Sequence, residues 1–209
     1  MNTNTNVVRR RGRPPKSGED RDTRELILRA GLDVLTEKGF AATGIDEILS
    51  RVSVPKGSFY HYFASKEAYG LALIDAYATY FAHKLDRHFN NINLLPIDRI
   101  NAFIIDAKEG MERYDFQRGC LIGNLGQEMG ALPDSFREKL IGVFRDWEVR
   151  LATCLAAAQA AGQVSKELDC LQLAASFWTG WEGAVLRAKL ERTTQPLSLF
   201  AQFFFSKLD

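Results

Sequence analysis

The chain has 209 residues, of which 46% are hydrophobic and 11% aromatic, so it can bury a core and is not an intrinsically disordered protein. The formal net charge is +1, but residues 1–70 hold three more basic than acidic side chains and the remainder holds two more acidic than basic ones. Because it has neither an apolar run of about twenty residues nor a signal-peptide core, we expect a cytoplasmic protein with no membrane partner. Its three cysteines are expected to be free thiols: Cys120, Cys154 and Cys170.

A basic segment without an acidic residue lies near the start of the sequence. Its five cations are Arg9, Arg10, Arg11, Arg13 and Lys16. The sequence R-R-R-G-R-P-P-K resembles the core of an AT-hook, an extended arm that lies in the minor groove of DNA. Gly12 allows a close approach to the groove, and Pro14 and Pro15 favour an extended chain. A solvated basic tail of no fixed role is the alternative. We assign residues 1–21 to this arm.

Two helices are expected after the arm. The first runs from Thr23 to Lys38 and ends at Gly39 as its C-terminal cap. Its inner face would consist of Leu26, Ile27, Ala30, Val34 and Leu35. The second helix follows Thr43, whose hydroxyl is placed to cap free amide groups. Its apolar residues repeat at i, i+3, i+4 and i+7: Ile45, Ile48, Leu49 and Val52. Each helix is therefore expected to have one buried face and one solvent-exposed face.

A turn over residues 53–57 separates the second helix from a third. Pro55 has no amide hydrogen and pushes Val54 out of helical geometry, so a new helix can begin near Pro55. Phe59 and Phe63 would point to the core. The convex face would carry a cation, hydroxyls and an imidazole, groups that suit phosphates and base edges: Lys56, Ser58, Tyr60, His61 and Tyr62.

The run G-S-F-Y-H-Y-F-x-S-K-E, within residues 24–82, resembles the helix-turn-helix of the TetR family of bacterial transcriptional regulators. The resemblance implies an all-α protein with a DNA-binding domain over residues 22–82 and an effector-sensing and dimerisation domain over residues 83–209. By position, the candidates for groove and phosphate contacts are Lys56, Gly57, Ser58, Tyr60, His61 and Lys66. Tyr62 is open between core packing and a backbone contact, and Thr43 between a phosphate contact and a plain N-cap. Ser65 would cap the fourth helix.

Helical periodicity continues through the rest of the chain almost without strand signals. A fourth helix would link the DNA-binding domain to the body. Further helices are expected from Pro96 towards Tyr114, from Cys120 to about Met129, and from Pro133 to a stop at Gly162. The body is therefore predicted to be a helical bundle.

The last two helices are expected to form a dimer surface. Apolar and aromatic residues recur along them at spacings of three and four, and the candidate interface residues are Leu171, Ala174, Val185, Phe200, Phe203 and Phe204. A role in the monomer core alone is the alternative. The TetR resemblance implies a four-helix bundle across a two-fold axis, with two recognition helices roughly 34–36 Å apart on a palindromic double-stranded DNA operator.

The segment R-G-C-L-I-G-N-L over residues 118–125 resembles the G-C-L-x-x-x-L signature of a TetR subgroup that responds to reactive electrophiles and oxidants. That subgroup includes regulators of unsaturated-carbonyl metabolism, such as that of acrylate. The resemblance makes Cys120 the sensor and Lys189 its partner. A position in the first turn of a helix and the nearby charge of Arg118 would stabilise a thiolate. The alternative is that Cys120 is a small packing residue.

Noncovalent sensing is also open. A pocket for a small carboxylate would be lined by Tyr114, Trp178, Trp181, Glu182 and Arg187, with the last binding the anion. The expected effector, covalent or not, is a small molecule or electrophile such as an unsaturated carboxylate or carbonyl compound.

An enzyme is the competing class of protein. No G-x-S-x-G, H-E-x-x-H or phosphate-binding loop motif occurs, and His61, His83 and His88 lack metal-ligand spacing, so we expect no catalysis, cofactor or metal. The preferred function is a homodimeric repressor that a small molecule or electrophile releases from its operator. A thiol-dependent enzyme around Cys120 and an architectural DNA-binding protein are the alternatives.

Overall fold

The structure is a computed structural model that describes residues 17–208. Over this range the chain forms helices and no strand, which confirms the predicted all-α class. The arm cations lie outside the described residues: Arg9, Arg10, Arg11, Arg13 and Lys16. None of the described helices combines the length and the apolar character needed to cross a membrane.

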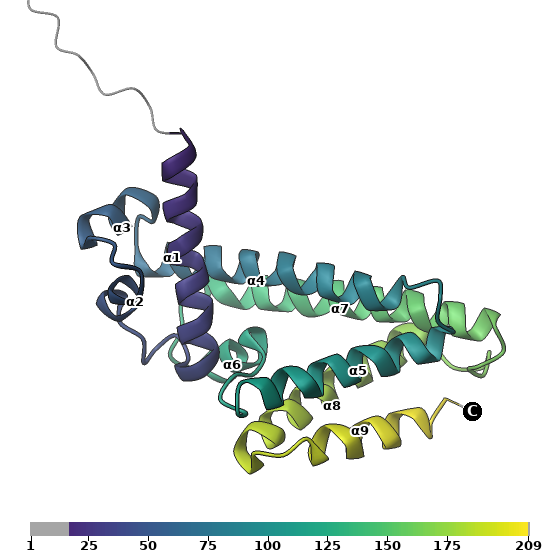
Figure 1. Ribbon diagram of the computed structural model, residues 1–209. Helices are drawn as coiled ribbons and strands as arrows, with labels where there is room; N and C mark the ends of the chain where they lie inside the picture. Colours follow the sequence, from purple (N-terminus) through teal and green to yellow (C-terminus); the bar gives the residue numbers. More distant parts are fainter. Residues whose placement is uncertain (1–16, 209) are drawn as a thin grey trace, which may run out of the picture.

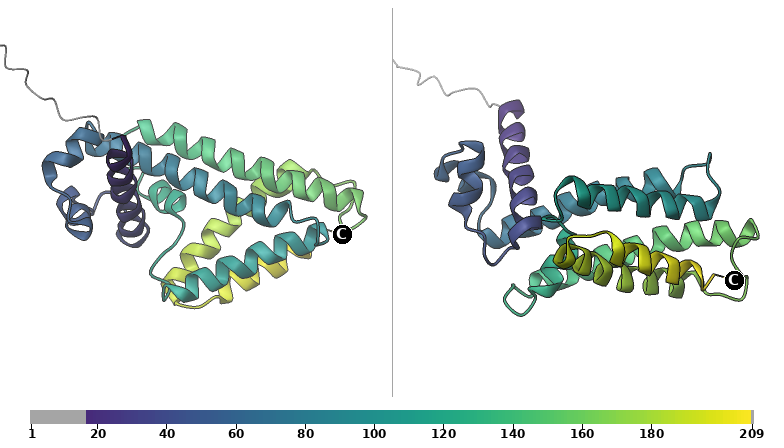
Figure 2. Two further views of the ribbon diagram at one scale, coloured as in Figure 1. Left: turned by 45° about the horizontal axis from the view of Figure 1, so that its top comes forward. Right: turned by 60° about the horizontal axis from the view of Figure 1, so that its bottom comes forward.

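Three helices form a small module at one end of the molecule (Figure 1). They are α1 (Ser17–Lys38), α2 (Ile45–Val52) and α3 (Lys56–Tyr62). Six further helices build an elongated body, in which α4 lies along α7 while α8 and α9 lie side by side (Figures 1 and 2). They are α4 (Lys66–Phe89), α5 (Pro96–Arg113), α6 (Leu121–Gln127), α7 (Ser135–Ala160), α8 (Cys170–Glu191) and α9 (Gln195–Phe205). The domain boundary that we predicted between residues 82 and 83 falls inside α4.

Helix α1 differs from its prediction in two respects. It begins at Ser17, so residues 17–21 of the predicted arm are helical. Leu26, predicted to be inside, is 46% exposed, because it lies at the edge of a buried face centred on Ile27 and Val34. The predicted end is confirmed: Gly39 has a φ of +85°.

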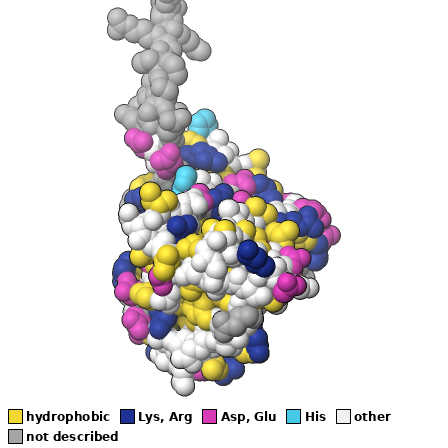
Figure 3. Space-filling view, turned by 90° about the vertical axis from the view of Figure 1, so that its right-hand side faces the viewer, with side chains coloured by type: hydrophobic (Ala, Val, Ile, Leu, Met, Phe, Trp, Pro, Cys, Tyr) yellow, Lys and Arg dark blue, Asp and Glu magenta, His cyan; other side chains and the backbone are white. Residues whose placement is uncertain are grey.

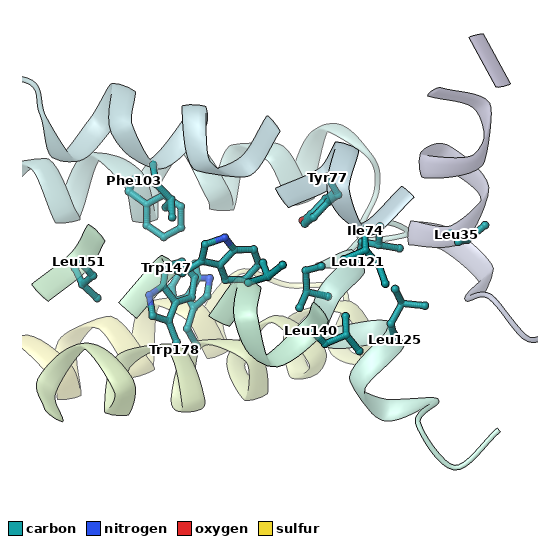
Figure 4. Close-up of a cluster of buried hydrophobic side chains, with 14 of the residues drawn as sticks. Leu35, Ile74, Tyr77, Phe103, Leu121, Leu125, Leu140, Trp147, Leu151 and Trp178 are labelled. Atoms are coloured by element: carbon teal, nitrogen blue, oxygen red, sulfur yellow. The ribbon is translucent and has the colours of Figure 1, made fainter. Parts of the chain in front are cut away.

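The core of the body is rich in aromatic side chains (Figure 4). The rings of Trp147 and Trp178 lie 5.0 Å apart between centroids, and Phe81 lies 4.5 Å from Trp147. Both of these tryptophans are fully buried, and their indole N–H groups find no acceptor among the described residues. The far end of the body, opposite the small module, exposes hydrophobic side chains among charged ones (Figure 3).

Candidate functional site

Helices α2 and α3 form the predicted helix-turn-helix. Ile48 and Leu49 of α2 are buried, and Ser53, with a φ of 53°, ends this helix. Pro55 is the N-cap of α3, as predicted from the turn. The N-cap of α2 is Gly44, which makes no side-chain cap.

The predicted role of Thr43 as a cap or phosphate contact is wrong in this conformation. Its hydroxyl donates a hydrogen bond to the Gly39 carbonyl oxygen at 2.6 Å, and the residue is only 2% exposed. The turn after α1 folds back on itself, so the hydroxyl satisfies a carbonyl that the end of that helix leaves free. The buried Thr43 side chain therefore stabilises this turn through a hydrogen bond to its backbone.

The recognition helix α3 has an aromatic inner side and an exposed outer side. Phe59 and Phe63 are buried, as predicted, and their ring centroids lie 5.2 and 4.8 Å from that of Tyr69. Lys56, Gly57, Tyr60 and His61 are exposed, and Ser58 and Tyr62 are half-buried. A rigid aromatic base thus carries a polar surface that can meet DNA.

Two charged side chains of this surface are already engaged. Lys56 Nζ lies 2.9 Å from Asp46 Oδ2 in an exposed ion pair, which leaves Lys56 accessible. Lys66, predicted to contact a phosphate, instead donates to the Phe40 carbonyl oxygen at 2.9 Å and lies over the Phe40 ring. Burial lowers the pKa of its ammonium group. Ser65 caps α4 as predicted, because its hydroxyl oxygen accepts from the Ala68 amide at 3.0 Å.

Cys120 lies at the N-cap of α6, and its Sγ accepts a hydrogen bond from the Gly123 amide at 3.4 Å. The carboxyl group of Glu182, from α8, and the hydroxyl of Tyr77, from α4, both influence the pKa of the thiol. A Cβ atom at position 123 would lie 2.0 Å from Glu182 Oε2, so glycine at this position makes room for the carboxyl group. Three elements thus bring a nucleophile and two titratable partners together.

The electrostatics of Cys120 differ from the prediction. Burial, followed by the charge of Glu182, raises the pKa of the thiol well above its usual value. Arg118, which we expected to stabilise a thiolate, binds Asp33 at 2.6 Å and Glu37 at 3.1 Å instead. Burial also raises the pKa of Glu182 to about 7. At rest the thiol is therefore protonated, and the carboxyl group titrates near neutral pH.

Lys189 does not pair with Cys120 in this conformation. Its ammonium donates to the Thr36 carbonyl oxygen at 3.1 Å and so binds the C-terminal end of α1, where a cation complements the helix dipole. Burial lowers the pKa of this ammonium group. The predicted Cys120–Lys189 contact would require the side chain to leave α1.

The predicted carboxylate pocket is also wrong, because its residues do not meet. Trp178 and Trp181 are buried in the core, and Glu182 faces Cys120. Arg187 is exposed and binds Glu191 on the outer surface of α8. Tyr114 is 45% exposed and stacks under the Arg118 guanidinium at 4.2 Å.

A hollow of about 660 Å³ lies where the small module meets the body. Its wall includes Gly39 from the end of α1, Asn124 from α6, and Lys189 from α8. Glu128, immediately after α6, also lines it. Its carboxylate accepts hydrogen bonds from the Phe40 amide at 3.0 Å and the Ala41 amide at 2.7 Å. No local pattern indicates a role for Glu128, because its partners are far away in the chain.

The residues predicted to form the dimer surface differ in their exposure. Leu171 and Phe203 are 58% and 60% exposed, while Val185 and Phe200 are half-buried. Ala174 and Phe204 are buried in the monomer core, because the inner faces of α8 and α9 pack on the body. Three exposed leucines on these two helices were missed: Leu186, Leu190 and Leu199.

Residues 27–70 match the family described as bacterial regulatory proteins, tetR family, and residues 96–204 match that described as tetracyclin repressor-like, C-terminal domain. The chain is 53% identical over 195 residues to the transcriptional regulator AcuR of Cereibacter sphaeroides, covering 93% of this chain and 89% of AcuR. It is 30% identical over 178 residues to the HTH-type transcriptional repressor NemR of Escherichia coli, covering 85% and 89%. A crystal structure of regulatory protein TetR from Rhodobacter sphaeroides matches with a TM-score of 0.87 at 54% identity, covering 88% of this chain and 98% of that one.

Proposed function

The chain belongs to the TetR family of DNA-binding transcriptional regulators, and from that premise we propose that it is a homodimeric repressor which a neutral unsaturated carbonyl compound releases from its operator. The observation that carries the proposal is the cluster of Cys120, Glu182 and Tyr77, which come from the start of α6, from α8 and from α4. Helix α6 contacts α1 of the DNA-binding module. Repression is supported by the name of the NemR relative. Modification at Cys120 would shift the body, move α4 and change the spacing of the two recognition helices.

The dimer is supported by the exposed apolar surface of α8 and α9. Leu199 and Phe203 line a second hollow, of about 660 Å³, between these helices. A surface of this kind can pair with its own copy across a two-fold axis, which would place two recognition helices on a palindromic operator. Light scattering should give twice the monomer mass for the wild type and the monomer mass for Phe203→Glu. Ile92→Glu, a change at an 87% exposed residue in the loop after α4, is the matched control and should leave the dimer intact.

The chemistry that we propose is addition of the Cys120 thiol to a carbon–carbon double bond conjugated to a carbonyl group. The sulfur forms a bond to the β-carbon, the π bond breaks, and the thiol proton passes to the Glu182 carboxylate. Glu182 then returns this proton to the α-carbon, so the product is a neutral thioether adduct, the carboxylate is regenerated and no redox change occurs. Because the thiol itself is protonated, a nearby proton acceptor is needed.

Glu182 also favours a neutral effector over a carboxylate anion such as acrylate. A second negative charge beside Glu182 would keep its carboxyl group protonated and remove the proton acceptor. The rates at which acrylamide and acrylate modify Cys120, each divided by the rate for free cysteine, should differ in favour of acrylamide. The preference should disappear in Glu182→Gln. Equal normalised rates in the wild type would contradict the choice of a neutral effector.

The decisive experiment for the proposed function is a mobility-shift titration on the DNA upstream of the gene itself, with and without N-ethylmaleimide. We expect release of the wild type and no release of Cys120→Ser. Release of the mutant would overturn covalent sensing at Cys120, and failure of the untreated protein to bind any palindromic DNA at low salt would overturn operator binding. Turnover of the electrophile without DNA binding would favour the enzyme alternative.

Noncovalent sensing is favoured by one separate observation: the buried indole N–H groups of Trp147 and Trp178 have no acceptor within the part of the chain that the structure describes. A small carbonyl compound that entered this core could accept both. Such a ligand would change tryptophan fluorescence and release DNA from Cys120→Ser as well as from the wild type.

A further inference from the structure

The turn between α1 and α2 is fastened to the body by one carboxylate. Glu128, at the C-terminal end of α6, accepts from the Phe40 amide through Oε1 at 3.0 Å and from the Ala41 amide through Oε2 at 2.7 Å. Both oxygens are used, so the contact is bidentate and fixes direction as well as distance. This turn leads directly into the helix-turn-helix.

Two residues next to the turn support the contact with Glu128. Gly39 has a φ of +85°, and a Cβ atom there would lie 2.1 Å from Glu128 Oε1, so a side chain would collide with the carboxylate. Lys66, at the start of α4, binds the Phe40 carbonyl on the other side of the same peptide segment. The turn is therefore held between a carboxylate from the body and an ammonium from α4.

The other end of the same short helix carries the sensor. Cys120 is the N-cap of α6 and Glu128 is its C-cap, which is a span of about 12 Å at 1.5 Å per residue. Between them, the Asn124 side-chain amide donates to the Thr36 carbonyl oxygen at 3.1 Å, so the middle of α6 also touches the end of α1. A shift of α6 at Cys120 would therefore move the carboxylate that holds the turn.

We propose that Glu128 is a positioning residue that couples the state of Cys120 to the orientation of the helix-turn-helix, an inference that rests on the proposed release by electrophiles. The carboxylate bonds hold the DNA-binding module in one orientation relative to the body. Adduct formation at Cys120 displaces α6, the two amides lose their acceptor, and the module leaves the orientation that fits the operator. Glu128 itself touches neither DNA nor the electrophile.

The first test measures coupling as the ratio of operator dissociation constants with and without N-ethylmaleimide. Glu128→Ala should reduce this ratio at least tenfold relative to the wild type, while mass spectrometry shows Cys120 alkylated at a rate within twofold of the wild type. Glu128→Gln keeps the volume and one acceptor oxygen, so its ratio should lie between those of the wild type and Glu128→Ala. Glu109→Gln, at an exposed carboxylate towards the C-terminal end of α5, is the matched control and should keep the wild-type ratio. A wild-type ratio in Glu128→Ala would overturn the proposal.

A second test does not depend on DNA. Hydrogen exchange at the Phe40 and Ala41 amides should accelerate when the wild type is alkylated, and should be fast in Glu128→Ala with or without alkylation. If alkylation accelerates exchange but the operator stays bound, the proposed release fails and the coupling by Glu128 stands. If alkylation leaves the exchange of both amides unchanged, the coupling is overturned whether or not DNA is released.

Discussion

The buried carboxyl group of Glu182 should make the stability of the protein depend on pH. Its pKa is about 7 in the folded chain against an ordinary value of 4.5, because burial disfavours the charged form. Between these two values the folded chain holds a proton that the unfolded chain has released, so the free energy of unfolding falls as pH rises. The stabilisation is fully present below pH 4.5 and is lost as pH rises through 7. At about 1.4 kcal/mol for each tenfold change in proton affinity, the loss is up to about 3 kcal/mol.

Glu182→Gln isolates this effect, because the amide keeps the volume and does not titrate. Urea unfolding of both proteins between pH 5 and pH 8, at one protein concentration and with reductant, gives the difference in their free energies of unfolding. As pH rises across this window, we expect the free energy of unfolding of Glu182→Gln to increase relative to that of the wild type by up to about 3 kcal/mol. The exposed Glu109→Gln is the control, and its difference from the wild type should not change with pH. If the Glu182→Gln difference is equally flat, the carboxyl group is not desolvated and the reasoning is refuted.

Two further predictions separate packing from function. Phe59→Ala should destabilise the protein by about 3–5 kcal/mol in urea unfolding, because the ring is fully buried. Tyr60 is half-exposed, so Tyr60→Ala should change the free energy of unfolding by no more than about 0.5 kcal/mol and should weaken operator binding. Equal effects on stability would contradict the assignment of the two faces of α3. Gly123→Ala should push away the Glu182 carboxyl group and slow alkylation of Cys120 by N-ethylmaleimide several-fold. Gly126→Ala is the control and should not slow it, because a Cβ atom there would lie more than 4 Å from the neighbouring atoms that the structure describes. Identical alkylation rates in the two variants would show that Glu182 takes no part in the reaction.

The helices and the inner faces of the helix-turn-helix could be predicted from the sequence, because they depend on local spacing. The burial of Phe59 and Phe63 followed from their separation on one helix, and Pro55 marked the start of α3. Exposure on α8 and α9 could not be predicted in the same way. Both helices are apolar on more than one side, so spacing alone did not separate the side that packs on the body, with Ala174 and Phe204, from the side that stays exposed.

The chemistry of Cys120 shows why a local pattern misjudges a site assembled from distant segments. We predicted that Cys120 lies in the first turn of a helix, and it is the N-cap of α6, one position before the first turn. Local rules alone would give a lowered pKa for a thiol at this end of a helix. The raised pKa comes instead from burial and from Glu182, which reaches the thiol from α8. Arg118 cannot offset these effects, because Asp33 and Glu37 of α1 hold its guanidinium group.

Gly123 and Gly39 share a role that neither their helix propensity nor their neighbours in sequence reveal. Gly123 leaves room for the carboxyl group of Glu182, and Gly39 leaves room for that of Glu128. Gly39 could be predicted as a helix cap, but the space that it leaves is filled by a side chain 89 positions away, visible only once α6 is placed against α1. A side chain at either glycine would displace a carboxyl group, at the thiol in one case and at the DNA-binding module in the other. At each end of α6, a carboxyl group therefore lies in the space that a glycine leaves.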